Sequence, residues 1–257
     1  ARGMTKYTVQ PTGSPVHDNV GDWPAKARCR AMLNWADKPT LLVMSGSMGF
    51  GSLIDQVDEL DSLPMDFQIA VICGNNADLR DKLLLRIEAG AYRKYGRPLG
   101  FIDNVETYMG AADIVCTKPG GLSVSETFCV GRPIVLLDPI PGLEELNAAF
   151  LVNNGLGVPT GRNYTLREAV YNLFSSPRRM ASIEREQKHN SPCDAADKLS
   201  AFLIQKAEIY RQSAPNREAP PGSMVGNKRR GRRQGQARVL ADPSKIYVKR
   251  GKRQKRA

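Results

Sequence analysis

The stretch TLLVMSGSMGFGSLIDQVDEL, residues 40–60, decides the fold that this sequence predicts. Residues 40–45 are a short run of mostly apolar and β-branched side chains, which is typical of a buried strand. Residues 46–51 follow with three glycines, and residues 52–60 then space their apolar side chains along one face of a helix. A strand, a glycine-rich turn and a helix in this order predict the first part of a βαβ unit.

The same alternation continues along the chain. Further strands are predicted at 67–73, 99–102, 113–117 and 133–137, and further helices at 75–89, 104–111, 123–129 and 144–153. Residues 165–211 are predicted to be helical, with Pro177 and Pro192 at helix boundaries. This pattern predicts a mostly parallel sheet covered on both faces, and right-handed crossovers make it a doubly wound α/β domain.

Charge is distributed unevenly over the 257 residues. The net charge is +11, yet residues 212–257 contain 14 Lys and Arg against 2 acidic residues, so the body of the chain is close to neutral. This basic tail has few core-forming residues, and we expect it to be disordered on its own. It is either a solvated extension or a segment attracted to polyanions such as anionic lipid head groups. Nucleic acid is a disfavoured partner, because Tyr247 is the tail's single aromatic residue and the body has no positive balance.

The sequence offers little sign of a membrane span or a metal site. Its longest apolar runs, such as 41–44 and 134–137, are far shorter than the roughly 20 residues of a spanning helix. Five widely spaced cysteines without a Cys-x-x-Cys pair favour a reducing compartment and argue against zinc. Cys73 and Cys116 lie in strand-like runs and are expected to be small buried hydrophobes. We therefore expect neither a metal nor a cofactor.

Three loops after predicted strands carry candidate binding residues, because ligands of parallel sheets bind where the carboxyl ends of the strands gather. The first loop, at 45–51, contains Gly46, Ser47 and Gly49, whose flexibility lets the backbone approach a ligand closely. Its spacing fits neither a P-loop nor a dinucleotide fingerprint. On its own, this loop is also explained as a structural turn.

The second loop, at 117–126, has the composition of an anion-binding site. It places Lys118 and two glycines directly before a predicted helix, whose free amides at 121–123 would face an anion along the helix dipole. Glu126 follows within the helix, where its carboxylate would accept hydrogen bonds from a ribose. A second interpretation is a capping box with Ser123 as the N-cap and Glu126 as its partner. The two interpretations need not exclude each other.

The third loop, at 138–147, places Glu144, Glu145 and Asn147 at another helix start. Acidic side chains there suit the positive end of the helix dipole, which explains them without a ligand. The hydroxyl groups of a sugar are an equally suitable target for the same groups.

Taken together, these segments resemble the C-terminal, donor-binding half of glycosyltransferase family 28. The resemblance spans about residues 8–200, and its motifs lie at 44–51, 100–105, 117–126 and 139–147. The Thr-Lys-Pro-Gly-Gly form of the second loop is similar to that of monogalactosyldiacylglycerol synthases and processive diacylglycerol glucosyltransferases. Residues 12–16 are similar to the segment that joins this domain to the family's N-terminal acceptor domain.

The resemblance implies the C-terminal, Rossmann-like half of a two-domain GT-B enzyme and a role for each motif. Residues 1–37 would be the interdomain linker and the end of an N-terminal domain, 38–211 the donor-binding domain and 212–257 the basic tail. The implied donor-binding residues are Gly46, Ser47 and Gly49 near the phosphates; Phe101 and Ile102 at uracil; Lys118, Gly120, Gly121, Leu122 and Ser123 at the diphosphate; Glu126 at the ribose; and Glu144 and Asn147 at the hexose. Where the family reads Pro-Gly-Gln-Glu, this chain has Leu143, which leaves the donor sugar open.

The implied reaction is the transfer of a hexose from a UDP-sugar to a lipid acceptor of the diacylglycerol type. No catalytic residue is expected in this chain, because the general base would come from the N-terminal acceptor domain, in cis or in trans. The expected location is the cytoplasmic face of a membrane, as a peripheral protein, with the plastid envelope as one candidate. The alternatives are a non-catalytic sugar-nucleotide-binding subunit of a split transferase and N-acetylglucosaminyl transfer to a lipid-linked acceptor.

Overall fold

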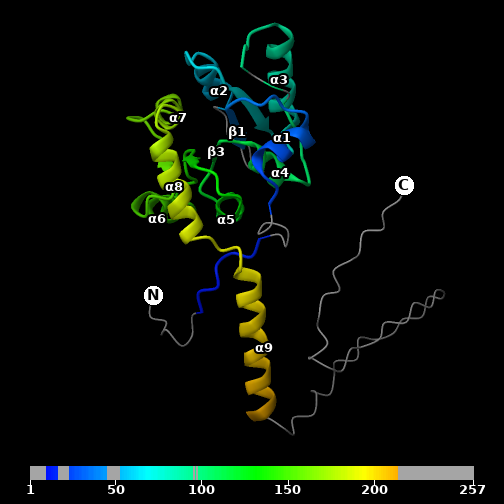
Figure 1. The fold of residues 1–257 in the computed structure, drawn as a ribbon, viewed down its shortest axis with the longest axis vertical. Coiled ribbons are helices and arrows are strands. Elements are labelled where there is room, and N and C mark those ends of the chain that lie inside the picture. Colours follow the sequence, from blue (N-terminus) through cyan, green and yellow to red (C-terminus); the bar gives the residue numbers. More distant parts are fainter. Residues whose placement is uncertain (1–9, 17–22, 45–52, 95, 97, 214–257) are drawn as a thin grey trace, which may run out of the picture. The chain divides into compact units, whose positions relative to one another are not determined.

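The computed structural model describes residues 10–16, 23–44, 53–94, 96 and 98–213 (Figure 1). By the contacts among its residues, the chain divides into two compact units, with the boundary between residues 210 and 211. From residue 214 on, the basic tail lies outside the described residues, and its expected disorder and its attraction to lipid stay predictions.

A five-stranded parallel sheet forms the centre of the fold. Its strands are β1 (Thr40–Met44), β2 (Gln68–Ile72), β3 (Ile114–Thr117), β4 (Ile134–Leu136) and β5 (Val158–Pro159). Their order is β2-β1-β3-β4-β5, and every neighbouring pair is parallel. The strand order reverses between β1 and β3, which is where doubly wound folds place their ligands.

Helices follow the strands as the sequence predicts. They are α1 (Lys26–Leu33), α2 (Leu53–Asp61), α3 (Ala77–Glu88), α4 (Val105–Ala111), α5 (Gly121–Val130), α6 (Glu145–Asn153), α7 (Leu166–Phe174), α8 (Pro177–His189) and α9 (Ala195–Ser213). One face of the sheet packs against α2, α3 and α7 through one buried cluster. The other face packs against α4, α5 and α6 through two further clusters. The predicted doubly wound parallel sheet is therefore confirmed.

Side-chain alternation along β1 explains how one strand serves both faces. Leu41 and Val43 are buried in the cluster with α2, and Leu42 and Met44 are buried in the cluster with α4. Neighbouring residues of a strand point to opposite faces, so a strand that is apolar at every position is buried on both.

Three elements differ from the sequence-based expectation. The predicted strand at 99–102 is wrong, because only Leu99 pairs with Ile72 before Gly100 interrupts the run. Strand β5 was not predicted, and its two residues are too short to give a periodic signal. Helix α1 lies within the segment expected as a linker, at 1–37.

Helix α1 is joined to the sheet by buried polar contacts. The guanidinium of Arg30, which is 8% exposed, lies 2.6 Å from the carboxylate of Asp113 and donates from Nε to the carbonyl of Ala111. Lys26 pairs with the same carboxylate, and the backbone amide of Thr40 donates to it at 2.7 Å. Asp113 precedes β3 and Thr40 opens β1, so these contacts close the amino edge of the sheet.

Two of the five cysteines are joined, which the sequence analysis did not predict. Cys129 near the end of α5 forms a disulfide with Cys193, which precedes α9. The separation of 64 residues hid this pairing in the sequence. Cys73 and Cys116 are free and buried, as expected. Burial raises the pKa of the Cys73 thiol to about 11 and raises that of Cys116 further, so both stay protonated and unreactive at neutral pH.

Candidate functional site

The carboxyl ends of three neighbouring strands surround a cavity of about 390 Å³. Met44 ends β1, Ile72 ends β2 and Thr117 ends β3, and all three line it. Its volume is within the usual range for a small-molecule site. The cavity lies at the reversal of strand order, so the position of the site could be predicted from the topology.

Helix α5 points its amino end at this cavity without a side-chain cap. The helix begins at Gly121, its N-cap is Gly120, and no side chain accepts a hydrogen bond at that cap. Ser123 is the third helical residue and not the N-cap, so the capping-box interpretation is wrong. The first amide bonded to a backbone carbonyl is that of Val124, which donates to Gly120 at 3.1 Å. Within the described part of the chain, the amides of 121–123 donate no hydrogen bond.

The side chains around this amino end include an exposed leucine and one half-buried carboxylate. Leu122, Ser123 and Glu126 lie on one face of α5 and line the cavity. Leu122 is largely exposed, whereas Glu126 is half-buried one turn further along the helix. A free helix amino end carries partial positive charge, and together with a nearby carboxylate it suits a ligand that has both an anionic group and hydroxyl groups.

The opposite wall is formed by the segments that follow β2. Phe101 and Ile102 line the cavity as the sequence predicted, and Phe101 is 69% exposed. Gly74 and Asn75 line it too, although the sequence analysis did not single them out. The sequence could have indicated them, because a Gly-Asn pair directly after a strand is typical of a turn. Gly74 has a φ of +58°, which favours glycine.

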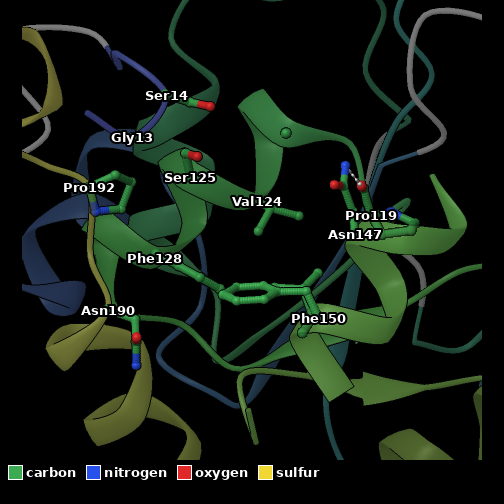
Figure 2. Close-up of a pocket in the computed structure, with 12 residues that line it drawn as sticks. Gly13, Ser14, Pro119, Val124, Ser125, Phe128, Asn147, Phe150, Asn190 and Pro192 are labelled. Carbon is green, nitrogen blue, oxygen red and sulfur yellow. Dashed lines mark hydrogen bonds between the residues drawn. The ribbon is translucent and has the colours of Figure 1, made fainter. Parts of the chain in front are cut away.

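Glu144 and Asn147 of the third loop do not line this cavity but lie next to the second loop. Glu144 accepts a hydrogen bond at Oε2 from the backbone amide of Ile140, at 2.9 Å. A Cβ atom placed on Gly120 would lie 3.4 Å from Oε1 of Glu144. Asn147 donates from Nδ2 to the carbonyl of Pro119 at 3.0 Å (Figure 2). Asn147 thus holds the turn from which α5 begins, and Glu144 stabilises the third loop beside that turn.

The structure therefore brings five of the predicted site residues to one cavity: Phe101, Ile102, Leu122, Ser123 and Glu126. Gly121 and Asn147 line a second cavity on another side of α5. Lys118, Gly120 and Glu144 belong to the adjoining loops. The remaining three, Gly46, Ser47 and Gly49, lie outside the described residues. Which of these residues contact a ligand stays a prediction.

Two features are absent from the described residues. No helix among them is both long and apolar enough to cross a membrane. No group of three or more His, Cys, Asp or Glu side chains in that part of the chain is placed to hold a metal ion.

A comparison with protein families matches residues 40–199 to the glycosyltransferase family 28 C-terminal domain. Among curated proteins, the processive diacylglycerol beta-glucosyltransferase of Bacillus licheniformis is 30% identical over 173 residues, which are 67% of this chain and 45% of that protein. The enzyme of the same name from Bacillus pumilus is 28% identical over 208 residues, which are 80% of this chain and 54% of that protein. The chain thus spans about half the length of these relatives.

Solved structures show the same fold at lower identity. MurG of Acinetobacter baumannii aligns with a TM-score of 0.55 and 23% identity, over 72% of this chain and 53% of that one. Anabaena Alr3699/HepE in complex with UDP-glucose aligns with a TM-score of 0.55 and 19% identity, over 75% of this chain and 56% of that one. The fold is that of the C-terminal, Rossmann-like half of GT-B glycosyltransferases.

Proposed function

The chain belongs to glycosyltransferase family 28 as its C-terminal domain, and on this premise we propose that it binds a UDP-sugar. In this proposal it supplies the donor half of an enzyme that transfers a hexose to a lipid acceptor of the diacylglycerol type. The acceptor half, in cis or in trans, completes the enzyme. The relatives named processive diacylglycerol beta-glucosyltransferase support this choice of acceptor.

The uncapped amino end of α5 is the observation that carries the proposal. Three backbone amides at 121–123 lack acceptors in the described part of the chain, and Leu122 and Ser123 line the cavity at the strand reversal. A diphosphate would satisfy these amides and interact favourably with the helix dipole. Lys118, two residues before the N-cap, would add positive charge to the same turn.

The other walls of the cavity suit a nucleoside. Phe101 offers an exposed aromatic ring for stacking on a base, and Ile102 lies beside it. Glu126 would accept hydrogen bonds from both hydroxyls of the ribose. The Anabaena neighbour of the same fold contains UDP-glucose, which makes UDP-sugars the first donors to test.

The proposed reaction is a displacement at the anomeric carbon of the donor sugar. The acceptor hydroxyl oxygen forms a bond to this carbon, the bond from the carbon to the diphosphate oxygen breaks, and UDP leaves with the electron pair. The acceptor's proton passes to a base of the acceptor half. In this chain, the amides of 121–123 and Lys118 stabilise the negative charge that gathers on the departing diphosphate, and the cavity walls fix its orientation. Because the acceptor is a lipid, we place the enzyme at the surface of a membrane, on its cytoplasmic face.

Calorimetric titration of the full chain with UDP, UDP-glucose, UDP-galactose, UDP-N-acetylglucosamine and ADP tests this function. We expect uridine nucleotides to bind more tightly than ADP, and the rank of the three sugars identifies the donor. Glu126→Ala should weaken UDP binding by roughly 1–3 kcal/mol, because a charged hydrogen bond to the ribose is lost.

Glu186→Ala is the matched control, because Glu186 is an exposed helical glutamate on α8 that does not line the cavity. Its affinity for UDP should equal that of the unaltered chain. Equal affinity for ADP and UDP would contradict the assignment of the base site. An unchanged affinity of Glu126→Ala would contradict the assignment of the ribose site.

A further inference from the structure

A second cavity, of about 250 Å³, lies against α5 and is lined by a different set of its residues (Figure 2). Its walls are formed by residues 13–14, Pro119 in the loop before α5, α5 itself, α6, and Asn190 and Pro192. For scale, an apolar cavity of about 150 Å³ is large enough to hold benzene. This cavity therefore has room for a short length of hydrocarbon.

The lining of the second cavity has an apolar part and a polar part. Phe128 and Phe150 extend toward each other (Figure 2), and Leu151 also lines the cavity. Ser125 and Asn147 contribute polar atoms. A cavity with both kinds of wall suits an amphiphile better than a purely polar or a purely apolar molecule.

Ser125 is the strongest indication of a ligand. Its side chain belongs to a residue that is 8% exposed, and its hydroxyl makes no hydrogen bond with the part of the chain that the structure describes. A hydroxyl that lines a cavity and has no partner within the described part of the chain is available to bind a ligand. Asn147 uses Nδ2 to bind Pro119, which leaves its Oδ1 as an acceptor.

The wall next to the N-terminal segment depends on a glycine. Gly13 has a φ of +84°, and a Cβ atom at this position would lie 2.9 Å from Cβ of Pro192. A larger residue would therefore push residues 13–14 away from Pro192. The close approach shows that residues 13–14 pack tightly against Pro192.

The second cavity also adjoins the donor site and the surface. Gly121 lines it, whereas the next two residues of α5, Leu122 and Ser123, line the donor cavity. Leu146 and Phe150 of α6 are four residues apart and are 73% and 56% exposed, and Leu143, in the turn before the helix, is 69% exposed. Residues with this spacing share one side of a helix. An apolar strip therefore runs along α6 to the cavity, through Phe150.

We propose that the second cavity binds hydrocarbon of an acylated glycerol, with its ester oxygens near Ser125 and Asn147 and its free hydroxyl directed toward the donor cavity. The inference rests on the proposed function, because it assigns part of the lipid acceptor's binding site to this donor domain. In that arrangement, the first turn of α5 separates the acceptor's apolar part from the departing diphosphate.

Titration of the full chain with dihexanoylglycerol, below the concentration at which it aggregates, tests this inference. Glycerol alone is the second probe, and UDP is titrated in parallel. We expect dihexanoylglycerol to bind in the millimolar range or tighter and glycerol not to bind, because the apolar contacts supply most of the affinity. Ser125→Val should weaken dihexanoylglycerol binding several-fold and leave UDP binding unchanged.

Phe150→Asp places a charge at the mouth of the cavity and should weaken dihexanoylglycerol binding at least tenfold. Leu203→Asp on α9 is its matched control, because Leu203 is 57% exposed and does not line the cavity. Equal losses in Phe150→Asp and Leu203→Asp would show unspecific adsorption and overturn the inference. If Phe150→Asp does not fold, Ser125→Val decides alone.

The outcomes also separate the two proposals. UDP binding without dihexanoylglycerol binding would overturn the inference and leave the proposed function standing. Dihexanoylglycerol binding that Ser125→Val does not change would overturn the assignment to this cavity. Absence of UDP binding would overturn the proposed function, and with it the role of the cavity as an acceptor site.

Discussion

The amino ends and the carboxyl ends of the parallel strands form two edges of the sheet, and these edges differ in whether their polar groups are paired. At the amino edge, the carboxylate of Asp113 binds Arg30, Lys26 and the amide of Thr40, so the groups brought together there are paired. At the carboxyl edge, the amides of 121–123 have no acceptor in the described part of the chain, and Gly120 gives them no cap. Both edges belong to the same strands.

This difference indicates that the amino edge contributes mainly to stability and the carboxyl edge mainly to ligand binding. Paired polar groups at the amino edge hold α1 to β1 and β3, and losing Asp113 would leave the buried amide of Thr40 without its acceptor and Arg30 without one of its partners. The amides of 121–123 at the carboxyl edge bind no acceptor of the described chain and are available to a ligand. Substitutions at the amino edge should therefore change the free energy of unfolding, and substitutions at the carboxyl edge should change affinity.

The largest expected effect is that of Asp113→Ala. It removes the more buried of the two carboxylates that pair with the Arg30 guanidinium, which keeps Asp37 and the carbonyl of Ala111. It also removes the acceptor of the buried amide of Thr40. Breaking a buried ion pair from one side costs about 3–5 kcal/mol, and urea unfolding should show a loss of this size. The folded fraction should bind UDP as the unaltered chain does.

The control for this change is Asp66→Ala. Asp66 pairs with Lys38 at 3.2 Å, but its side chain is 86% exposed, so the loss should stay below about 1 kcal/mol. The comparison between the two edges fails if Asp113→Ala unfolds no more easily than Asp66→Ala. It also fails if Asp113→Ala weakens UDP binding in molecules that remain folded.

The next effect concerns the disulfide near the end of α5. Cys129 is tied to Cys193, at the end of the helix opposite to the free amides. Replacing both cysteines by serine should lower the free energy of unfolding by about 2–4 kcal/mol, because the crosslink restricts the unfolded chain over 64 residues. Thermal unfolding with and without dithiothreitol measures this contribution.

The unaltered chain should lose stability in reductant, and the double serine variant should not respond. A response of that variant would point to another redox-active group. UDP affinity is expected to be the same in all four samples, since the crosslink lies away from the donor cavity.

Local pattern was sufficient for most of the fold. Apolar runs and helical spacing predicted β1 to β4 and the helices that follow them, because each of these elements buries a face whose period is visible in the sequence. Helix α1 was missed because polar pairs tie it to the body, with Arg30 far along the chain from Asp113. A contact between distant residues leaves no local pattern, and the same reason hid the pairing of Cys129 with Cys193.

The candidate site was predictable in composition and less so in geometry. Topology places the carboxyl ends of β1, β2 and β3 together, so Phe101, Ser123 and Glu126 could be expected to meet. The exact start of α5 could not be read from the motif, since Ser123 followed by Glu126 also fits a capping box. Helix bounds depend on cap geometry, which residue type alone does not determine.

The smallest effect on stability is expected from Gly120→Ser, and it tests the comparison most directly. Gly120 has a φ of −74°, and a Cβ atom there would lie 3.4 Å from Glu144 Oε1, so serine fits with a small adjustment. Its hydroxyl would cap the free amides and raise the free energy of unfolding by a few tenths of a kcal/mol. The same hydroxyl would compete with the diphosphate for these amides, so UDP should bind more weakly. Calorimetry and urea unfolding of one sample measure both changes. Tighter UDP binding or lower stability of Gly120→Ser would contradict the proposal that the free amides at the start of α5 bind the diphosphate.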